Sequence, residues 1–291
     1  MMDAWVGIIA AVYTFHQYIT MKLFAILSST VLASVALASP LTLERRARNA
    51  ARLQARVAQR HSNLPFKAGT NEILHLNETT HEEYSSNWAG AVLIGSGYTS
   101  VTGTFTVPTP SAPSGADSDE QYCATAWVGI DGDTCQSAIL QTGVDFCIDS
   151  SGTTFDAWYE WFPDYSHDFS GISISAGDKV KVTVDASSKT AGTAIVENLT
   201  TGKTVSHTFT GQDDNALCET NAEWIMEDFS SFLSLVPFAN FGTVTFTDIS
   251  ATSGDSSVGA SNATIIDIQQ NNKTLTSSSA SDTEVTIKYI G

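Results

Sequence analysis

Apolar and polar residues alternate in short runs from about residue 84 to the end of the chain, and Gly, Asp, Asn and Thr residues separate the runs. In Val180-Lys181-Val182-Thr183-Val184, for example, a strand would have one apolar and one polar face. No stretch with the period of a long helix occurs in this part of the sequence. Such runs, over roughly 200 residues, are typical of one antiparallel β-sandwich or barrel. The predicted strands are 86–94, 98–107, 124–130, 137–146, 154–162, 179–186, 193–198, 204–210, 222–227, 243–249, 264–268 and 284–290.

The N-terminal part has the features of a secretory signal peptide over residues 21–38. Met21-Lys22 is followed by an apolar run and by small residues before Ser39. This run is too short for a membrane span, so a secreted, extracellular protein without a membrane partner is expected. Residues 1–20 precede the signal as an extension, and either Met21 is the true start or the signal is longer.

Residues 39–80 are predicted to be a propeptide, followed by an acidic domain over residues 81–291. Between Leu43 and His61, apolar residues recur at roughly helical spacing among arginines, which predicts a basic amphipathic helix. The alternative is a disordered leader that is discarded. No linker or internal repeat divides the acidic domain further.

Basic and acidic residues are segregated along the chain, which has a formal net charge of −17. Residues 39–70 carry six arginines and Lys67 against one acid, Glu44. Residues 71–291 carry no arginine and six lysines against 29 acids, a net charge of −23. A basic arm often binds nucleic acid, but this one precedes a very acidic domain, so its expected partner is that domain and not nucleic acid. The repulsion within the domain fades as carboxylates protonate, which is typical of a protein that works in acid; simple solubility is the alternative.

Four cysteines in a secreted chain predict two disulfides, with three pairings open. The strands around residues 124–130 and 137–146 form a hairpin, with a turn signal at residues 131–134. A hairpin centred near residue 135 places Cys123 opposite Cys147 and leaves Cys135 for Cys218. Sequons make Asn77, Asn198, Asn262 and Asn272 candidate glycosylation sites.

Several kinds of hydrolytic site are missing from the sequence. It has no HExxH, CxxC or GxSxG motif, and nothing pairs His167 or His207 with a nucleophile. The cysteines are assigned to disulfides. Metal, serine and cysteine chemistry are therefore not expected, and no metal or other cofactor is predicted.

The remaining candidates for a functional site are carboxylates that lie among aromatic residues. Trp88 follows Asn87, residues Asp156, Trp158 and Glu160 alternate and so share a sheet face, and Glu223 shares a face with Glu227. Acids beside aromatic rings in a secreted β domain are typical of a ligand groove. For any one of these residues taken alone, a core aromatic or a solvated acid is the better interpretation.

Hydrolysis in acid narrows the choice of catalytic groups. A carboxylate with a pKa of about 4 is still ionised there and can activate water, whereas a histidine would already be protonated. The hairpin is expected to bring Trp127, Asp131 and Gln141 within reach of one another. A neutral amide such as that of Gln141 can stabilise an oxyanion at any pH. One Glu and one Gln are thus a sufficient set for peptide hydrolysis.

Six motifs occur in order: SNWAG, AWVGIDGDTCQ, AILQTG, DAWYEW, ENLTTG and NAEWIMEDF. Together they resemble the fungal glutamic peptidases, the eqolisins of peptidase family G1, over about residues 84–291. The resemblance implies an all-β fold, an antiparallel β-sandwich of two packed, curved sheets. It also implies secretion as a preproenzyme and pepstatin-insensitive endopeptidase activity in acid on proteins and peptides. It places the catalytic residues at Gln141 and Glu227, with supporting groove residues at Trp88, Trp127, Asp131, Asp156 and Glu160.

This resemblance predicts a division of roles. Glu227 takes a proton from water, Gln141 holds the oxyanion, and Glu227 then protonates the leaving amine. Asp131 and Asp156 are expected to orient these two residues through hydrogen bonds. The enzyme is expected to act as a monomer, with its own propeptide as an intramolecular inhibitor. The sequence departs from the family in having Ser230 to Ser234 where some members carry a further disulfide, and in the added Cys123–Cys147 pair.

Two other functions compete with this one. A β-sandwich glycoside hydrolase would use Glu160 and Glu227 as its carboxylate pair, about 5 Å apart if it retains configuration, with Gln141 as a sugar-binding amide. A carbohydrate-binding module would stack its tryptophans on sugars and have no catalytic acid. Digestion of protein against polysaccharide separates these possibilities.

Overall fold

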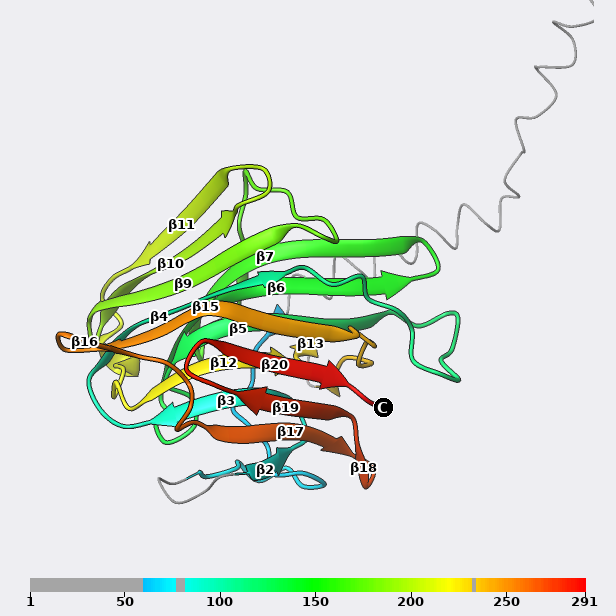
Figure 1. Cartoon of the computed structure of the whole chain (residues 1–291), viewed down its shortest axis with the longest axis horizontal. Helices are drawn as coiled ribbons and strands as arrows, with labels where there is room; N and C mark the ends of the chain where they lie inside the picture. Colours follow the sequence, from blue (N-terminus) through cyan, green and yellow to red (C-terminus); the bar gives the residue numbers. More distant parts are fainter. Residues whose placement is uncertain (1–59, 77–81, 232–233) are drawn as a thin grey trace, which may run out of the picture. The chain divides into compact units, whose positions relative to one another are not determined.

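The computed structural model describes residues 60–76, 82–231 and 234–291. The predicted extension, the signal peptide, most of the propeptide and Asn77 lie outside these residues, as does the predicted boundary near residue 80. Within them, the chain forms two large β-sheets and one small sheet (Figure 1). Nearly all neighbouring strands are antiparallel, and β2 beside β17 is a parallel exception.

The larger sheet has nine strands, and Figure 1 shows most of them one above another, from β7 down to β17. In spatial order it contains β18 (Lys273–Thr274), β17 (Thr264–Gln270), β3 (Trp88–Ile94), β12 (Asn221–Glu227), β5 (Tyr122–Ile130), β6 (Ile139–Asp149), β7 (Gly152–Phe162) and β8 (His167–Asp168), with β2 (Glu82–Ser85) beside β17.

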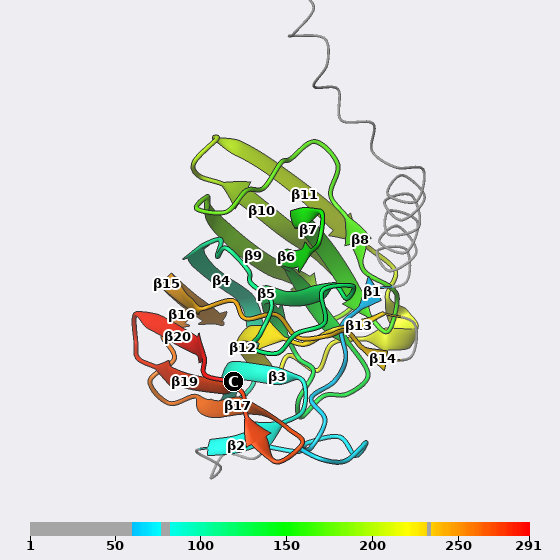
Figure 2. The same cartoon turned by 90° about the vertical axis from the view of Figure 1, so that its right-hand side faces the viewer.

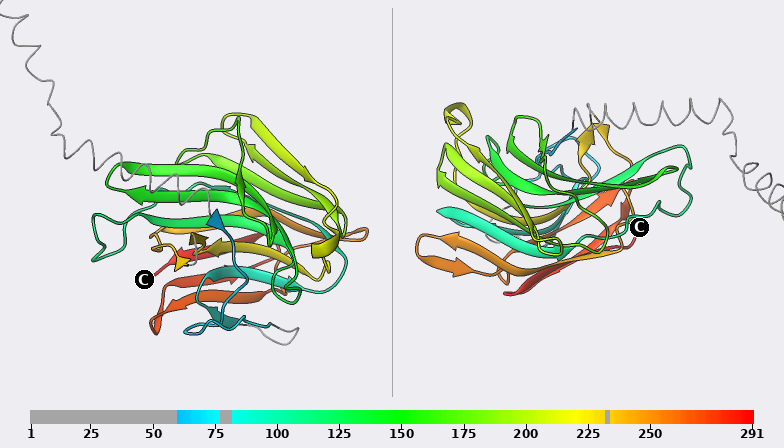
Figure 3. Two further views of the ribbon diagram at one scale, coloured as in Figure 1. Left: turned by 180° about the vertical axis from the view of Figure 1, so that it is seen from behind. Right: turned by 90° about the horizontal axis from the view of Figure 1, so that it is seen from above.

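The second sheet has eight strands and packs against the first, so that both appear as curved layers when seen from above (Figure 3, right). In order it contains β11 (Lys203–Phe209), β10 (Ala191–Asn198), β9 (Lys179–Ser188), β4 (Tyr98–Thr106), β15 (Thr243–Ser253), β20 (Glu284–Tyr289) and β19 (Thr276–Ala280), with β16 (Ser256–Val258) beside β15. The third sheet joins β1 (Arg60–His61), β13 (Ser230–Ser231) and β14 (Ser234–Leu235), and Figure 2 shows β1 next to β13. One 3-10 turn spans Asp213–Asn215.

The main core lies between the two large sheets and follows from the alternation of residues along each strand. In β9, the side chains of Val180, Val182 and Val184 are buried against the nine-stranded sheet, while Lys179 and Lys181 point outward. Trp224 of β12 enters the same core, and its indole N–H donates to the Thr102 carbonyl across the sandwich at 2.8 Å.

The centre of the nine-stranded sheet is buried on both faces. All seven residues of β12 are buried, as are the first nine of β6. One face packs on the second sheet, and the opposite face is covered by residues 60–76, which we call the covering segment. Leu64, Leu74 and Leu76 of this segment are 5–8% exposed and pack with Trp88 and Trp127 in a second apolar cluster. Complete burial of such a side chain contributes about 1.5–3 kcal/mol, so the three leucines are substantial anchors.

The structure confirms the predicted all-β sandwich, and each of the twelve predicted strands overlaps an observed one. Short strands without a clear alternation, such as β2 and β19, were not predicted. The predicted helix is wrong at its end, because Arg60 and His61 form β1 and pair with Ser231 and Ser230. Pairing with the edge of β13 in the acidic domain outweighs the helical propensity of residues 60 and 61.

Both predicted disulfides are present. Cys123 and Cys147 are direct cross-strand partners, which places the hairpin centre at residue 135 as expected. The bond between Cys135 and Cys218 ties the hairpin turn to the segment that precedes β12. In the described part of the chain, no helix is long and apolar enough to cross a membrane.

The candidate glycosylation sites differ in accessibility. Asn262 and Asn272 are exposed and stay predicted acceptors. Asn198 is fully buried, and its amide nitrogen donates to the Asp178 carboxylate at 2.8 Å and to the Ser173 carbonyl at 3.0 Å. A glycan on this nitrogen would take the place of one of these two N–H donors, and the nitrogen is not accessible in the folded domain.

Candidate active site

The face of the nine-stranded sheet under the covering segment carries most of the predicted site residues. We call it the cleft face. Directly paired residues of neighbouring antiparallel strands point to the same side of a sheet, so the strand register identifies its members. Across β12, β5, β6 and β7 they form three rows: Glu223, Gly129, Gln141 and Glu160; Ile225, Trp127, Gly143 and Trp158; Glu227, Thr125, Asp145 and Asp156. Trp88 of β3 extends the third row next to Glu227.

Glu227 is fully buried at the end of β12 and both of its carboxylate oxygens are hydrogen-bonded. The Trp127 indole N–H donates to Oε2 at 2.9 Å, and the backbone N–H of Asn63 in the covering segment donates to Oε1 at 2.8 Å. Burial raises the pKa of Glu227 to about 7, against the opposing effects of the Arg60 charge and of these hydrogen bonds. The carboxyl group is therefore an acid whose ionisation depends on what covers it.

Gln141 lies two strands away from Glu227 on the cleft face and is also fully buried. Neither its amide nitrogen nor its amide oxygen has a hydrogen-bond partner among the described residues. Buried amides are normally paired, so this one has donor and acceptor capacity to offer to a reacting group or to water. Gly143 lies next to Gln141 on the same face and is paired with Trp127. A Cβ atom at residue 143 would lie only 2.5 Å from the Cβ atom of Trp127, so this position of Trp127 requires a glycine at residue 143.

Arg60 enters the cleft face from the covering segment and pairs with two acids. Its guanidinium donates to both oxygens of Asp145, at 2.7 and 3.0 Å, and to Glu160 Oε2 at 3.3 Å. It also stacks on Trp158, with the guanidinium carbon 3.7 Å from the ring centroid. Burial raises the pKa of Asp145 and of Glu160, and the Arg60 charge opposes both shifts.

The covering segment continues past Arg60 as an extended chain over Glu227. The Ser62 N–H donates to Glu160 Oε2 at 3.2 Å, and the Asn63 carbonyl accepts a hydrogen bond from the Trp88 indole at 2.9 Å. Asn87 binds the next residues of the segment through its side-chain amide, which accepts from the Phe66 N–H and donates to the Leu64 carbonyl. Backbone atoms of the segment are therefore bound as those of a peptide in a cleft would be.

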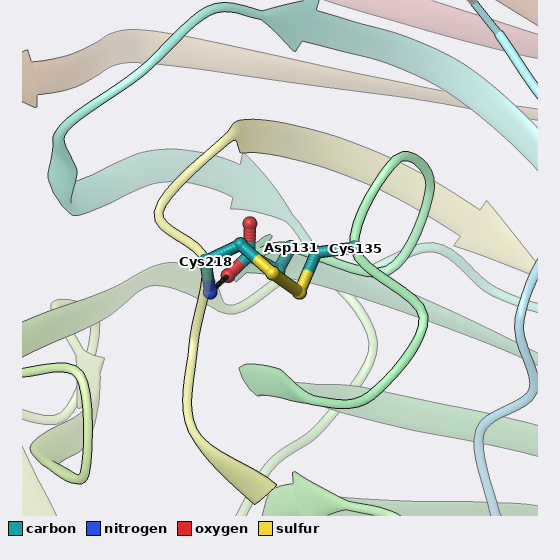
Figure 4. A group of neighbouring side chains, drawn as sticks. All are labelled: Asp131, Cys135 and Cys218. Atoms are coloured by element: carbon teal, nitrogen blue, oxygen red, sulfur yellow. Dashed lines mark hydrogen bonds between the residues drawn. A yellow bond between two sulfur atoms is a disulfide. The ribbon is translucent and has the colours of Figure 1, made fainter.

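Asp131 does not have its predicted role of orienting Gln141 or Glu227. Its carboxylate accepts hydrogen bonds from four successive backbone N–H groups, those of residues 218–221, at 2.7–3.2 Å. Figure 4 shows the bond to the Cys218 N–H beside the Cys135–Cys218 disulfide. The two sulfur atoms are bonded to each other, so this group is not a metal site. Asp131 instead fixes the loop from which β12 begins.

Asp156 lies on the cleft face directly opposite Asp145, and the pair is part of the same row as Glu227. Burial, followed by the Asp145 charge, raises its pKa. No hydrogen bond between the described residues joins Asp156 to Glu227 or Gln141, so the predicted direct orienting role is not observed. The acid paired with it across the strands is Asp145.

Asp145 and Arg60 are the functional candidates that sequence reasoning missed. Asp145 could have been found, because it lies four residues after Gln141 on the same strand and therefore on the same face. Arg60 could be recognised only as one of several basic residues of the propeptide, and its ion pairs require the three-dimensional structure.

Comparisons with known proteins identify the family. The sequence profile described as the Peptidase A4 family matches residues 86–289. The chain belongs to this family. Aspergillopepsin-2 of Aspergillus niger is 58% identical over 285 residues, which covers 93% of this chain and all of the relative. Scytalidopepsin B of Scytalidium lignicola is 46% identical over 273 residues, 91% of this chain and 98% of the relative.

Solved structures of Peptidase A4 members share the fold. A scytalido-glutamic peptidase bound to a transition state analog inhibitor superposes with a TM-score of 0.65 and 48% identity, over 70% of this chain and 98% of that one. Aspergilloglutamic peptidase from Aspergillus niger superposes with a TM-score of 0.57 and 63% identity, over 58% of this chain and 99% of that one. The chain is therefore a hydrolase, a glutamic peptidase of the eqolisin type, and protein or peptide substrates follow from the family.

Proposed function

We propose that this protein is a secreted endopeptidase that works in acid through the pair Glu227 and Gln141. The observation that carries the proposal is their placement: a buried Glu held by the Trp127 indole and a buried, unpartnered Gln amide on one face of the sheet. Peptide-like backbone already lies on that face, with its N–H on Glu227. Family membership supports peptide hydrolysis over other reactions.

The proposed reaction uses one proton carrier and one oxyanion donor. Glu227, as carboxylate, takes a proton from a water molecule while the water oxygen attacks the scissile carbonyl carbon. The Gln141 amide N–H stabilises the negative charge on the former carbonyl oxygen. Glu227 then gives its proton to the leaving nitrogen as the C–N bond breaks, which returns the carboxylate. No net proton is consumed at Glu227.

Glu227 can act as a base in acid only if its pKa falls below the value of about 7 that burial produces in this structure. Removal of the covering segment exposes the carboxylate to water, which favours the charged form. The Trp127 hydrogen bond is independent of the covering segment and continues to favour ionisation. The proposed base therefore becomes active when the cleft opens.

The covering segment is proposed to be the propeptide's inhibitory part. It places backbone over Glu227, Arg60 between Asp145 and Glu160, and apolar side chains beside Trp88 and Trp127. A substrate cannot use the same hydrogen bonds at the same time. Because the Arg60 charge lowers the pKa of Asp145 and Glu160, its attraction is present while these acids are ionised and is lost as pH falls through their pKa values.

The structure gives little support to a glycoside hydrolase that uses Glu160 and Glu227. These residues lie on β7 and β12, with β5 and β6 between them, and in different rows of the cleft face. Glu160 is bound by Arg60 and by the Ser62 N–H, which suits a site that recognises peptide. The carbohydrate-binding alternative has no support from the family assignment.

The test is digestion of casein by the processed protein in acid, with the variants Glu227→Gln and Gln141→Ala. Each variant should lose nearly all activity while its far-UV circular dichroism and thermal midpoint stay close to those of the unaltered protein. Glu284→Gln, which removes an exposed acid from the other sheet, is the matched control and should remain fully active. Activity within tenfold of the control in either site variant would refute the mechanism, and polysaccharide hydrolysis in place of casein digestion would refute the reaction class.

A further inference from the structure

Glu223 is a buried acid that the mechanism above leaves without a role. It lies near the start of β12, its side chain is fully buried, and neither of its carboxyl oxygens has a hydrogen-bond partner within the described residues. An unpartnered polar group inside a protein is costly, and a hydrophobic side chain at this position would avoid the cost. The position of Glu223 relative to Gln141 suggests what the carboxyl group does.

Glu223 and Gln141 face each other across a glycine. Both are paired with Gly129 of β5, one from each side, so they lie in one row of the cleft face. A Cβ at Gly129 would lie 3.3 Å from Glu223 Oε2 and 2.8 Å from a ring carbon of Trp127. The Glu223 carboxyl group is thus directed over Gly129, toward the side on which the unpartnered Gln141 amide lies.

The span between the two side chains suits one bridging water molecule. Directly opposite residues have Cβ atoms about 4.5–5.5 Å apart, so two steps across the sheet separate Glu223 from Gln141 by about 10 Å. Two side chains of this length cover most of that distance, and a single water can bridge one carboxyl oxygen of Glu223 and the amide oxygen of Gln141. The four polar atoms concerned, two on each residue, are all buried and unpartnered in the described structure.

We propose that Glu223 is a positioning residue for Gln141: in its neutral form it donates a hydrogen bond, through one water molecule, to the amide oxygen of Gln141, which directs the amide nitrogen toward the oxyanion. This inference rests on the proposed role of Gln141. An amide oxygen and nitrogen have the same shape, so packing alone does not select which of them points at the reacting carbonyl. A hydrogen-bond donor on the side away from the substrate binds the amide oxygen of Gln141, so the amide nitrogen then points at the reacting carbonyl.

The surroundings of Glu223 favour its neutral form. Burial raises its pKa well above the usual range, and the nearby charges of Asp133 and Asp131 raise it further. Asp133 is itself buried, with a pKa raised to about 7 by burial. The other titratable or charged groups around this face are Glu227 on the same strand, Glu160 at the far end of the row, and His75 of the covering segment, which contacts Gln136. Asp145, Asp156 and Arg60 lie on the same face at the row of Glu227 and beside Glu160.

The pH dependence follows from these charges. While Glu223 is neutral, its O–H can donate toward the Gln141 oxygen. As pH rises through its pKa, the group becomes a carboxylate that only accepts hydrogen bonds. The bridging water then donates to Glu223, and the water oxygen can accept the amide N–H that the oxyanion needs. Glu227 requires ionisation and sets the acid limb of activity, whereas Glu223 requires protonation and contributes to the limb at higher pH.

The test compares Glu223→Gln and Glu223→Leu in the processed enzyme, with kcat and KM for a fluorogenic peptide measured from acid to neutral pH. Glutamine keeps a donor that does not ionise, and leucine keeps the volume without a donor. We expect Glu223→Leu to lower kcat by about tenfold or more, up to the roughly 100- to 1000-fold of a lost oxyanion donor, with KM within threefold. Glu223→Gln should keep kcat within threefold and extend activity to higher pH.

The proposal is overturned if Glu223→Leu, shown by circular dichroism to be folded, keeps the kcat of the unaltered enzyme. It is also overturned if the pH profile of Glu223→Gln superposes on that of the unaltered enzyme, a result that remains informative should the leucine variant fail to fold. Gln141→Ala is measured in parallel. An inactive Gln141→Ala together with unaffected Glu223 variants refutes only the positioning role, whereas an active Gln141→Ala refutes the proposed function itself.

Discussion

Replacement of Arg60 by Gln tests how the covering segment is held in the cleft. Arg60 is 2% exposed and donates to both oxygens of Asp145, and a third contact reaches Glu160. Loss of one partner from a buried ion pair costs about 3–5 kcal/mol, because the remaining charge stays buried without compensation. Since each 1.4 kcal/mol is a factor of ten, the inhibition constant of the propeptide should rise by about 100- to 4000-fold.

The assay uses a propeptide spanning residues 39–80, added to the processed enzyme, with hydrolysis of a fluorogenic peptide followed at several pH values. Lys67→Gln is the matched control, because it removes one positive charge from an exposed position of the same segment. This control should change the inhibition constant by less than about threefold, as expected for an exposed charge.

The pH dependence of this assay separates two effects of opposite sign. Burial by the covering segment raises the pKa of Asp145 and Glu160, which strengthens binding in acid, whereas the Arg60 charge lowers these pKa values, which weakens binding in acid. The burial effect is common to both propeptides. The ratio of the two inhibition constants, that of Arg60→Gln over that of the unaltered propeptide, should therefore fall as pH falls. A ratio that does not change with pH, or an inhibition constant unaffected by Arg60→Gln at neutral pH, would refute the ion-pair account.

Two further substitutions test the supporting residues. Trp127→Phe removes the 2.9 Å hydrogen bond to Glu227. Because that bond favours the carboxylate, the acid limb of the pH profile of kcat/KM should move to higher pH, and kcat should fall about 10- to 100-fold, the range for a hydrogen bond to a charged group. An unchanged acid limb would contradict this role of Trp127. Asp131→Ala removes the acceptor of four backbone N–H groups and should lower the thermal midpoint by about 6–12 °C for a loss of about 3 kcal/mol. The kcat of the folded enzyme should stay within threefold, and a large fall in kcat with an unchanged midpoint would restore the orienting role expected from the sequence.

The strands and the cleft face could largely be predicted, because both depend on the two-residue period of a β-strand. The alternation that identifies the strands also places Asp156 with Glu160 and Glu223 with Glu227 on common faces, as observed. The Cys123–Cys147 bond followed from the same register. Local pattern is sufficient where neighbouring strands are joined by a short hairpin.

Contacts between distant segments could not be predicted from local pattern. Asp131 is close to Gln141 in sequence, yet it binds backbone N–H groups of residues 218–221, almost 90 residues further along the chain. The strand at Arg60 and His61 depends on its pairing with Ser230 and Ser231, which lie about 170 residues further along the chain. The burial of Asn198 depends likewise on Ser173 and Asp178, which no sequon reveals.

The central claim, that the Gln141 amide donates to the oxyanion, is tested most directly by kcat of Gln141→Glu and Gln141→Ala across the acid range. A protonated glutamic acid at residue 141 still offers an O–H donor, and it loses this donor as it ionises. The account predicts that Gln141→Ala is nearly inactive at every pH, and that Gln141→Glu has measurable activity in strong acid that disappears as pH rises. Activity of Gln141→Ala within tenfold of the unaltered enzyme would contradict it.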